Sequence, residues 1–378
     1  MALIQPVEDG KIPKDTSTTS KSDTSNDLGY DQFLQLLCAE MQYQDPLEPT
    51  SNTEYVAQLA TFSQMESMLN MQNSIESTKA NDLVGKYVIE KLARIPVTVD
   101  IASEFRYRDP ILSAEDLVII ISQSGETADS LAALRLCKEK GVKTLGIVNV
   151  VGSSIAREAD NVFYTLAGPE ISVATTKAYS CQLVAAYLLA MQFAKARGEI
   201  SDERFAQLVE EINTIPEKIE KILEDKERLQ WFASKVVNIK DAFFIGRGID
   251  YAVGMEGSLK LKEISYIHSE AYAAGELKHG PISLIEDGTV VFSVVTQSAL
   301  YEKTISNMVE VKSRGAKLFG LTTYGNYAME DVADFTVYTP RIDNLFAASL
   351  SVVPLQLLSY YVSVGKGYDV DKPRNLAK

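Results

Sequence analysis

The second half of the chain repeats a pattern that occurs 174 residues earlier, and this feature restricts the possible folds more than any other. The segment SQSGETADSLAALRLCKEKGVKTLGIVN begins at Ser122, and the related segment TQSALYEKTISNMVEVKSRGAKLFGLTT begins at Thr296. The same spacing separates further identical residues: Gln123 and Gln297, Gly141 and Gly315, Lys143 and Lys317, Gly146 and Gly320, Gln182 and Gln356, and Tyr187 and Tyr361. Repetition over this length indicates that a whole domain has been duplicated.

Each copy reads as a strand, a turn, a helix, a second strand, a short third strand and a long apolar helix. Strands that alternate with helices are typical of a parallel sheet covered by helices on both faces. The sequence therefore predicts an α/β fold built from two duplicated domains. We place the first copy at residues 86–234 and the second copy at residues 235–378.

The first copy lacks a segment that the second copy contains. Residues 242–281 read as an apolar strand, a glycine turn and a helix, with the glycines at Gly246 and Gly248. The corresponding residues 68–74 are MLNMQNS, which have no strand pattern and no glycine. We therefore predict that the first copy lacks its opening strand, and that two unrelated sequences are joined near residues 81–88.

The N-terminal part of the chain differs from the rest in composition. Residues 1–85 hold 13 acidic residues against 4 lysines and no arginine, so they carry most of the net charge of −14. Polar residues dominate up to position 28, which predicts a disordered tail over residues 1–28. Residues 29–85 contain two runs of apolar side chains at helical spacing, separated by QDPLEP, and are predicted to form a helical segment.

Composition excludes several classes of function. A net charge of −14 argues against nonspecific nucleic-acid binding. Cys38, Cys137 and Cys181 are isolated, which fits a reducing compartment and indicates no zinc site. The N-terminus lacks the apolar core of a signal peptide, and the apolar run from Leu345 contains Pro354, which favours a buried helix over a membrane span. We expect a cytoplasmic protein with no metal, cofactor or membrane association.

The stretch IIISQSGETADS, residues 119–130, is the first candidate binding site. An apolar strand runs directly into Ser122, Ser124 and Thr127 around Gly125, and a helical pattern follows. Hydroxyl groups and unpaired N–H groups at the start of a helix can bind a phosphate. An ordinary helix N-cap, with Ser124 as the capping residue, explains the same pattern equally well.

Glu263 and His279 are candidates for proton transfer. Glu263 interrupts the apolar stripe of Met255, Leu259 and Ile267, and burial there would raise its pKa. Spacing alone favours a simple ion pair between Glu263 and Lys260. His279 lies in a Gly-Pro turn, an exposed setting that suits proton transfer near neutral pH, whereas His268 reads as a packed core residue.

Residues 86–378 resemble the isomerase half of the glutamine–fructose-6-phosphate aminotransferase family, which consists of two sugar isomerase (SIS) domains. The resemblance rests on VDIASEFRYRDPI, SQSGETADSL, TKAYSCQL, GRGIDYAVGMEGSLKLKEISYIHSEAYAAGELKHGP and VDKPRNLAK. Residues 28–86 resemble the N-terminal segment of flagellar hook-capping proteins, through YDQFLQLLCAEMQYQDPLEPTSNTEYVAQLATFSQMESM and ANDLVGK. We interpret the chain as a chimera of these two families.

The resemblance implies a role for each candidate residue. The phosphate of fructose 6-phosphate or glucosamine 6-phosphate would be bound by Ser122, Gln123, Ser124 and Thr127. Glu263 would move a proton between C1 and C2 beside Lys260, and His279 would open the sugar ring in the neighbouring subunit of a homodimer. The remaining sugar contacts would come from Val173, Thr175 and Ala377. Lys378 would be catalytic, contacting the open-chain sugar and forming an imine with the ketose. A terminal carboxylate at Lys378 would raise its amine pKa and weaken it as a nucleophile.

The chain contains neither the glutaminase domain of this family nor its CGTS-like strand end, so we expect isomerisation without glutamine-dependent amino transfer. Two alternatives remain open. The chain could be a catalytically impaired sugar-phosphate-binding module, or a component of flagellar hook assembly that contacts hook proteins through residues 28–85.

Overall fold

The computed structural model describes residues 79–374, and every structural statement below concerns that part of the chain. The disordered tail predicted for residues 1–28, and all but the last residues of the helical segment predicted for residues 29–85, lie outside it. So do Ala377 and Lys378.

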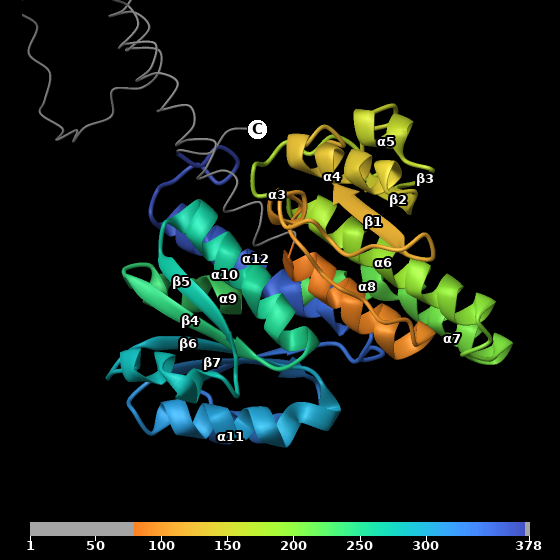
Figure 1. The fold of residues 1–378 in the computed structure, drawn as a ribbon. Helices are drawn as coiled ribbons and strands as arrows, with labels where there is room; N and C mark the ends of the chain where they lie inside the picture. Colours follow the sequence, from red (N-terminus) through yellow and green to blue (C-terminus); the bar gives the residue numbers. More distant parts are fainter. Residues whose placement is uncertain (1–78, 375–378) are drawn as a thin grey trace, which may run out of the picture. The chain divides into compact units, whose positions relative to one another are not determined.

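The first copy forms a three-stranded parallel sheet in the order β1-β2-β3. Figure 1 shows α4 and α5 on one side of these strands and α6 on the other. The elements are α3 (Ala102–Phe105), β1 (Leu117–Ser122), α4 (Ala128–Glu139), β2 (Lys143–Val148), α5 (Ser154–Glu158), β3 (Asn161–Tyr164) and α6 (Thr176–Ala196).

Three helices connect the two copies: α7 (Asp202–Asn213), α8 (Ile215–Glu224) and α9 (Lys226–Val236). The hydroxyl of Ser201 accepts a hydrogen bond from the backbone N–H of Arg204 and caps α7. Pro216 lies in the first turn of α8, where its missing N–H costs nothing. Arg204 also forms an ion pair with Asp343 at 2.5 Å, which ties α7 to the second copy.

The second copy forms a five-stranded sheet in the order β5-β4-β6-β7-β8, with all neighbouring strands parallel. Figure 1 shows α10 on one face of this sheet and α11 on the other. The strands are β4 (Asp241–Gly246), β5 (His268–Ala273), β6 (Val290–Val295), β7 (Lys317–Thr323) and β8 (Phe335–Thr339). The α-helices are α10 (Ile249–Ser265), α11 (Tyr301–Lys312) and α12 (Ala347–Gly365), and the short 3-10 helices are η1 (Leu277–His279), η2 (Pro281–Leu284), η3 (Ser298–Leu300) and η4 (Tyr327–Asp331). Two duplicated α/β domains were predicted, and this prediction is confirmed.

No strand equivalent to β4 occurs among the described residues of the first copy. In the second copy, β5 pairs only with β4, and β4 also pairs with β6. Residues 94–99 correspond to β5, and their side chains alternate between more and less exposed, as in a strand, but they belong to no sheet. Because the described part of the first copy has no counterpart of β4, this segment has no partner strand. The described residues therefore agree with the predicted loss of the opening strand.

The predicted junction at residues 81–88 lies inside a helix. Residues 79–93 are helical without interruption, and Ala80, Val84, Val88 and Leu92 are buried at four-residue spacing. This helix packs on α6, where Asn81 Nδ2 donates a hydrogen bond of 2.7 Å to Gln182 Oε1. The predicted junction therefore falls within a continuous helix and not in a loop.

The two copies share one hydrophobic core. Tyr187 of α6 packs against Phe346 with ring centroids 4.9 Å apart, and its hydroxyl lies 3.2 Å from Ser349 Oγ at the start of α12. Among the described helices, only α12 is long and apolar enough to cross a membrane, and it is mostly buried against α10 and α9. Gly257 allows the close approach of α10 and α12, because a Cβ there would lie 2.6 Å from Leu355 Cδ1. The apolar run is thus a core helix, as predicted.

Candidate functional site

The candidate phosphate loop, residues 122–127, connects β1 to α4. Ser122 Oγ accepts a hydrogen bond of 3.0 Å from the backbone N–H of Gly125 and lies 3.2 Å from Thr127 Oγ1. Gly125 has a φ of 67°, and a Cβ at this position would collide with Ser153 Oγ. Glycine is therefore required at position 125 both by backbone conformation and by space.

Ser124 does not cap α4, so that interpretation of the loop is wrong. The N-cap residue is Thr127, whose side chain makes no capping hydrogen bond. Ser124 Oγ instead accepts a hydrogen bond of 3.2 Å from the backbone N–H of Glu126. Both Ser124 and Thr127 are exposed, so their hydroxyl groups are accessible at a helix start that no side chain caps. This arrangement favours anion binding over simple capping.

Two buried polar atoms beside the loop have no hydrogen-bond partner among the described residues: Gln123 Oε1 and Ser153 Oγ. Buried polar groups in folded proteins are nearly always paired, so such atoms mark a place where a ligand group can bind. Gln123 was predicted to belong to the site. Ser153 was not, because it lies in a different turn and approaches the loop only in the folded chain.

A surface pocket lies next to the phosphate loop. It is lined by Asn149, Val150, Leu166, Gly168 and Pro169. The backbone N–H of Asn149 donates to the carbonyl of Gln123 at 3.2 Å, which connects the pocket to the loop. The Asn149 side chain also bonds to the N–H of Ala167 at 2.7 Å and to the carbonyl of Gly168 at 2.8 Å. Sequence reasoning missed this pocket, since no motif marks its residues.

Lys260 and Glu263 form a buried ion pair on α10. Lys260 Nζ lies 2.6 Å from Glu263 Oε2 and 3.6 Å from Glu256 Oε1. Burial would lower the pKa of Lys260, but the carboxylates of Glu256 and Glu263 raise it above its ordinary value. Lys260 therefore carries its positive charge at neutral pH. Glu256 was missed, although its position four residues before Lys260 places both on one helix face.

The ion pair that spacing alone favoured is confirmed, but its burial sets it apart from an ordinary surface pair. Nearly every residue of α10 is buried, and Lys260 and Glu263 are only 2 % and 7 % exposed. Charged side chains are rarely buried without a specific reason, because removing them from water costs free energy. A functional role explains this cost better than stability does.

A loop of the first copy contacts this ion pair. Lys260 Nζ donates a hydrogen bond of 2.6 Å to the carbonyl of Ala174, which lies between Val173 and Thr175. Thr175 adopts a left-handed conformation with a φ of 57°, and its hydroxyl bonds to the carbonyl of Val173 at 2.7 Å. The structure thus brings Val173, Thr175, Lys260 and Glu263 together, as the resemblance implied.

The C-terminal segment approaches the same loop. The backbone N–H of Val173 donates to the carbonyl of Asp371 at 3.2 Å, and the N–H of Arg374 donates to the Tyr266 hydroxyl at 2.7 Å. The Arg374 guanidinium also lies 4.3 Å from the centre of the Tyr266 ring. These contacts lead the chain toward α10 just before Ala377 and Lys378, whose roles stay predictions.

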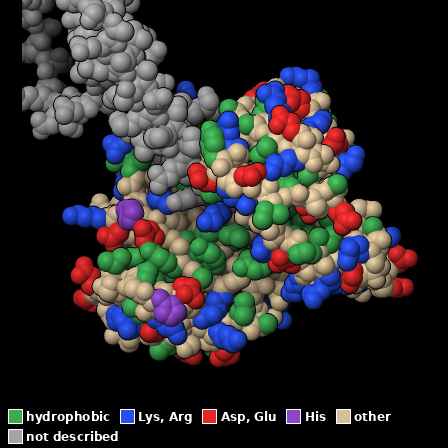
Figure 2. All heavy atoms as spheres, in the orientation of Figure 1, with side chains coloured by type: hydrophobic (Ala, Val, Ile, Leu, Met, Phe, Trp, Pro, Cys, Tyr) green, Lys and Arg blue, Asp and Glu red, His purple; other side chains and the backbone are tan. Residues whose placement is uncertain are grey.

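Both histidines are exposed. His279 Nδ1 lies 2.8 Å from Glu276 Oε2, and its side chain is 61 % exposed, as predicted for a turn residue. His268 is 69 % exposed, so its prediction as a core residue is wrong. The reason is that α10 ends at Ser265 and Tyr266 turns left-handed, which places His268 at the start of edge strand β5. Figure 2 shows histidine side chains at two separate places on one face.

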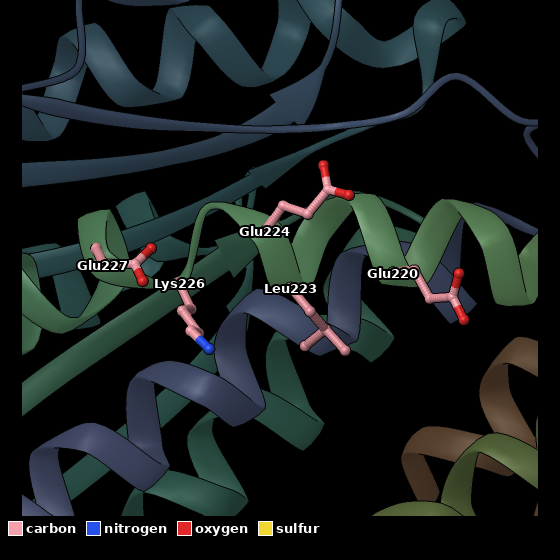
Figure 3. Close-up of a pocket in the computed structure, with 5 residues that line it drawn as sticks. All are labelled: Glu220, Leu223, Glu224, Lys226 and Glu227. Carbon is pink, nitrogen blue, oxygen red and sulfur yellow. The ribbon is translucent and has the colours of Figure 1, made fainter.

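A further hollow lies away from these residues, between α8 and α9. Figure 3 shows its lining side chains: Glu220, Leu223, Glu224, Lys226 and Glu227. None of the predicted site residues contributes to it. Within residues 79–374, no group of three or more His, Cys, Asp or Glu side chains could hold a metal ion.

Comparison with known proteins identifies the fold. The family model for the SIS domain matches residues 83–192 and 235–365, one match for each copy. The chain belongs to the SIS domain family. The model for the N-terminal region of the flagellar hook capping protein matches residues 9–77, which begins earlier than the predicted residue 28 and lies wholly outside the described residues.

The SIS copies are similar to the isomerase half of one family of enzymes. The chain is 61% identical over 296 residues to glutamine–fructose-6-phosphate aminotransferase (isomerizing) from Clostridium tetani, and 48% identical to that from Thermus thermophilus. Each alignment covers 78% of this chain and 49% of the relative, so the chain spans about half the length of the curated relatives it matches.

Solved structures agree with this assignment. The C-terminal domain of glucosamine-fructose-6-phosphate aminotransferase from Francisella tularensis is 40% identical, with a TM-score of 0.76, over 79% of this chain and 84% of that chain. Glucosamine-6-phosphate deaminase from Thermotoga maritima is 27% identical, with a TM-score of 0.64, over 80% and 86% of the two chains. The double SIS fold is thus shown both by sequence and by structure.

Proposed function

We propose that this SIS protein binds fructose 6-phosphate or glucosamine 6-phosphate and interconverts ketose and aldose forms, as the isomerase half of an aminotransferase in hexosamine biosynthesis. The observation that carries this proposal is the buried pair of Lys260 and Glu263, which is bonded to the loop around Ala174 of the other copy. A buried carboxylate can remove a proton next to a carbonyl, and a buried cation beside it can stabilise the oxyanion that forms.

The phosphate group would bind at residues 122–127. Its oxygen atoms accept hydrogen bonds, and the loop offers the exposed hydroxyls of Ser124 and Thr127 with Gln123 and Ser122 beside them. The loop end of β1 lies at the carboxyl edge of a parallel sheet, where α/β proteins usually bind their ligands. Anchoring the phosphate there would leave the sugar carbons free to reach the second copy.

Glu263 would act as the base in the isomerisation. Its carboxylate removes a proton from the carbon next to the carbonyl and returns it to the neighbouring carbon, through an enediol intermediate. O2 gains a proton as the enediol forms, and the O1 hydroxyl loses a proton as C2 is reprotonated, so atoms and charges balance without an external reagent. The ammonium group of Lys260 would stabilise the negative charge that develops on the oxygen.

The other site residues would act before and around this step. His279 would open the sugar ring from the neighbouring subunit of a homodimer, with Glu276 orienting its imidazole. Val173, Thr175, Ala377 and Lys378 would hold the open chain. Mixing Glu263→Gln chains with His279→Ala chains should restore activity that neither variant has alone, because one of the two mixed sites keeps both residues. No restoration in a proven mixed dimer would contradict the shared site.

The direct test of the function is an isomerase assay on fructose 6-phosphate and glucose 6-phosphate. Glu263→Gln should lower the rate about 10²–10⁴-fold, since general acid–base catalysis contributes that much. Glu302→Gln, an exposed position in the first turn of α11, is the matched control and should leave the rate unchanged. Equal rates for both variants would remove Glu263 from this role.

Residues 28–85 suggest a second association. The match to the hook-capping model over residues 9–77 supports a contact with flagellar hook proteins, in a chain that combines two families. A pull-down of purified hook protein by the full chain, but not by a chain shortened to residues 79–378, would support this contact. Equal recovery by both chains would argue against it. We propose the cytoplasm as the location, since the substrate is a metabolic sugar phosphate.

A further inference from the structure

The second copy has its own version of the phosphate loop, and a side chain of the same chain fills it. Thr296 corresponds to Ser122: Ser122 is the last residue of β1, and Thr296 directly follows β6. The carboxylate of Asp250 accepts hydrogen bonds from the backbone N–H of Thr296 at 2.7 Å and of Gln297 at 3.1 Å. It also accepts a short hydrogen bond from the Thr296 hydroxyl.

These contacts are those of a bound anion. Two backbone N–H groups and one hydroxyl converge on two carboxylate oxygens, the combination of donors that recognises phosphate at strand ends. Asp250 is only 2 % exposed. Its carboxylate accepts hydrogen bonds from residues that follow β6 and not from the N–H groups of its own helix, α10. An acidic residue that merely stabilised the start of α10 would bond to the N–H groups of α10.

We propose that Asp250 is an internal substitute for phosphate, which closes an anion site in the second copy. The side chain thereby determines that the chain binds substrate phosphate at one loop and not at two. Removing the carboxylate should convert the second loop into a site for inorganic phosphate or a phosphate monoester. The analogy with the first loop rests on the proposed function, but the contacts of Asp250 do not.

The surroundings of Asp250 allow such a site to open. Gln297 Nε2 donates to the carbonyl of Asn344 at 3.2 Å, and Asn344 Nδ2 lies 3.0 Å from Ser298 Oγ. These polar groups lie next to the donors that Asp250 now uses. Ser298, the residue after Gln297, is exposed, so solvent reaches the loop at that position. The counterpart of Asp250 in the first copy is Glu76, which lies outside the described residues, so the comparison rests on the loops themselves.

The test uses the full chain with Ser124→Ala and Thr127→Ala, which weakens the first phosphate site until it no longer gives a detectable titration with inorganic phosphate. In this background, Asp250→Ala should bind one equivalent of inorganic phosphate by calorimetry, because three donors lose their anion and the side-chain volume is freed. Asp250→Asn is the matched control, because its amide still fills the space, and it should bind none. The background protein without a change at position 250 should also bind none.

Thermal unfolding provides a second measurement if Asp250→Ala destabilises the protein. Phosphate should then raise the melting temperature of Asp250→Ala, whereas chloride at equal ionic strength should not, since a ligand stabilises the state that binds it. Absence of both calorimetric binding and phosphate-specific stabilisation would overturn the proposal. Undiminished phosphate binding by the Ser124→Ala, Thr127→Ala chain with Asp250 intact would instead contradict the proposed first site. The effect of Asp250→Ala is then still measured as a second equivalent of bound phosphate.

Discussion

The two copies keep the same order of strands and helices but carry different parts of the site. The first copy has an accessible hydroxyl loop at Ser124 and Thr127, and the position equivalent to Glu263 is Ile89, a buried apolar residue. The second copy has the buried pair Lys260–Glu263, while its own loop is filled by Asp250. The two similar domains would thus contribute different parts of one site.

The two sheets also differ in their number of described strands. The second copy has five strands, whereas the described part of the first has three, and β1 pairs only with β2. Its counterpart β6 lies between β4 and β7. The helix over residues 79–93 keeps its place on α6 even though no strand is described before it. The helix over residues 79–93 therefore packs on α6 in the described part of the chain, as its equivalent α10 packs on α12 in the second copy.

The largest contrast between the copies should come from equivalent lysines, Lys260 and Lys86. Lys260→Met leaves Glu256 and Glu263 buried without their cation, so the free energy of unfolding should fall by about 3–5 kcal/mol. Lys86 forms a partly exposed pair with Glu90 at 3.7 Å, so Lys86→Met should cost less than about 1 kcal/mol. Urea unfolding of both variants measures the difference. Equal losses would show that burial of the second pair has no energetic consequence.

The loops provide the next contrast. Ser124→Ala with Thr127→Ala should weaken binding of glucosamine 6-phosphate by about 2–4 kcal/mol, since two donors to a charged group are lost. The matched change in the second copy, Ser298→Ala with Tyr301→Phe, should leave affinity unchanged. Calorimetric titration decides between them. A larger loss of affinity from the changes in the second copy would show that the phosphate binds at the loop after β6.

A pH dependence should distinguish Asp250 from a neutral residue. Burial raises its pKa from 3.8 to about 6, against the hydrogen bonds from Thr296 and Gln297 that lower it. A carboxyl group whose pKa is higher in the folded state contributes stability below its unfolded pKa, and this contribution is lost as pH rises through the folded pKa. The stability of the natural chain relative to Asp250→Asn should therefore fall by up to about 3 kcal/mol between pH 4 and 6. Chemical unfolding across this range tests the sign, and a rise would contradict it.

The smallest contrast concerns the edge of the first sheet. Amides of β1 should exchange with solvent faster than those of β6, by about fivefold for each missing ladder hydrogen bond of about 1 kcal/mol. Hydrogen exchange measured by mass spectrometry resolves the two strands. Equal protection would indicate that another segment pairs with β1.

The sequence predicted those features that depend on spacing along the chain. The repeat predicted the α/β fold, whereas the strand loss predicted from residues 68–74 stays a prediction, because those residues lie outside the described part of the chain. The pair of Lys260 and Glu263 followed from helical periodicity. Ser153 and Asp250 could not be predicted, because each approaches its loop from a separate element and acts only through tertiary contact. His268 was misjudged because nothing local showed that α10 ends at Ser265.

The central claim is that the first copy binds the phosphate and the second copy moves the proton. Solvent exchange of the C1 proton of fructose 6-phosphate in D₂O, followed by NMR, tests this claim without requiring completed isomerisation. Glu263→Gln should bind glucosamine 6-phosphate as tightly as the natural chain but incorporate about 10²–10⁴-fold less deuterium at C1. Undiminished deuterium incorporation in that variant would show that another group moves the proton.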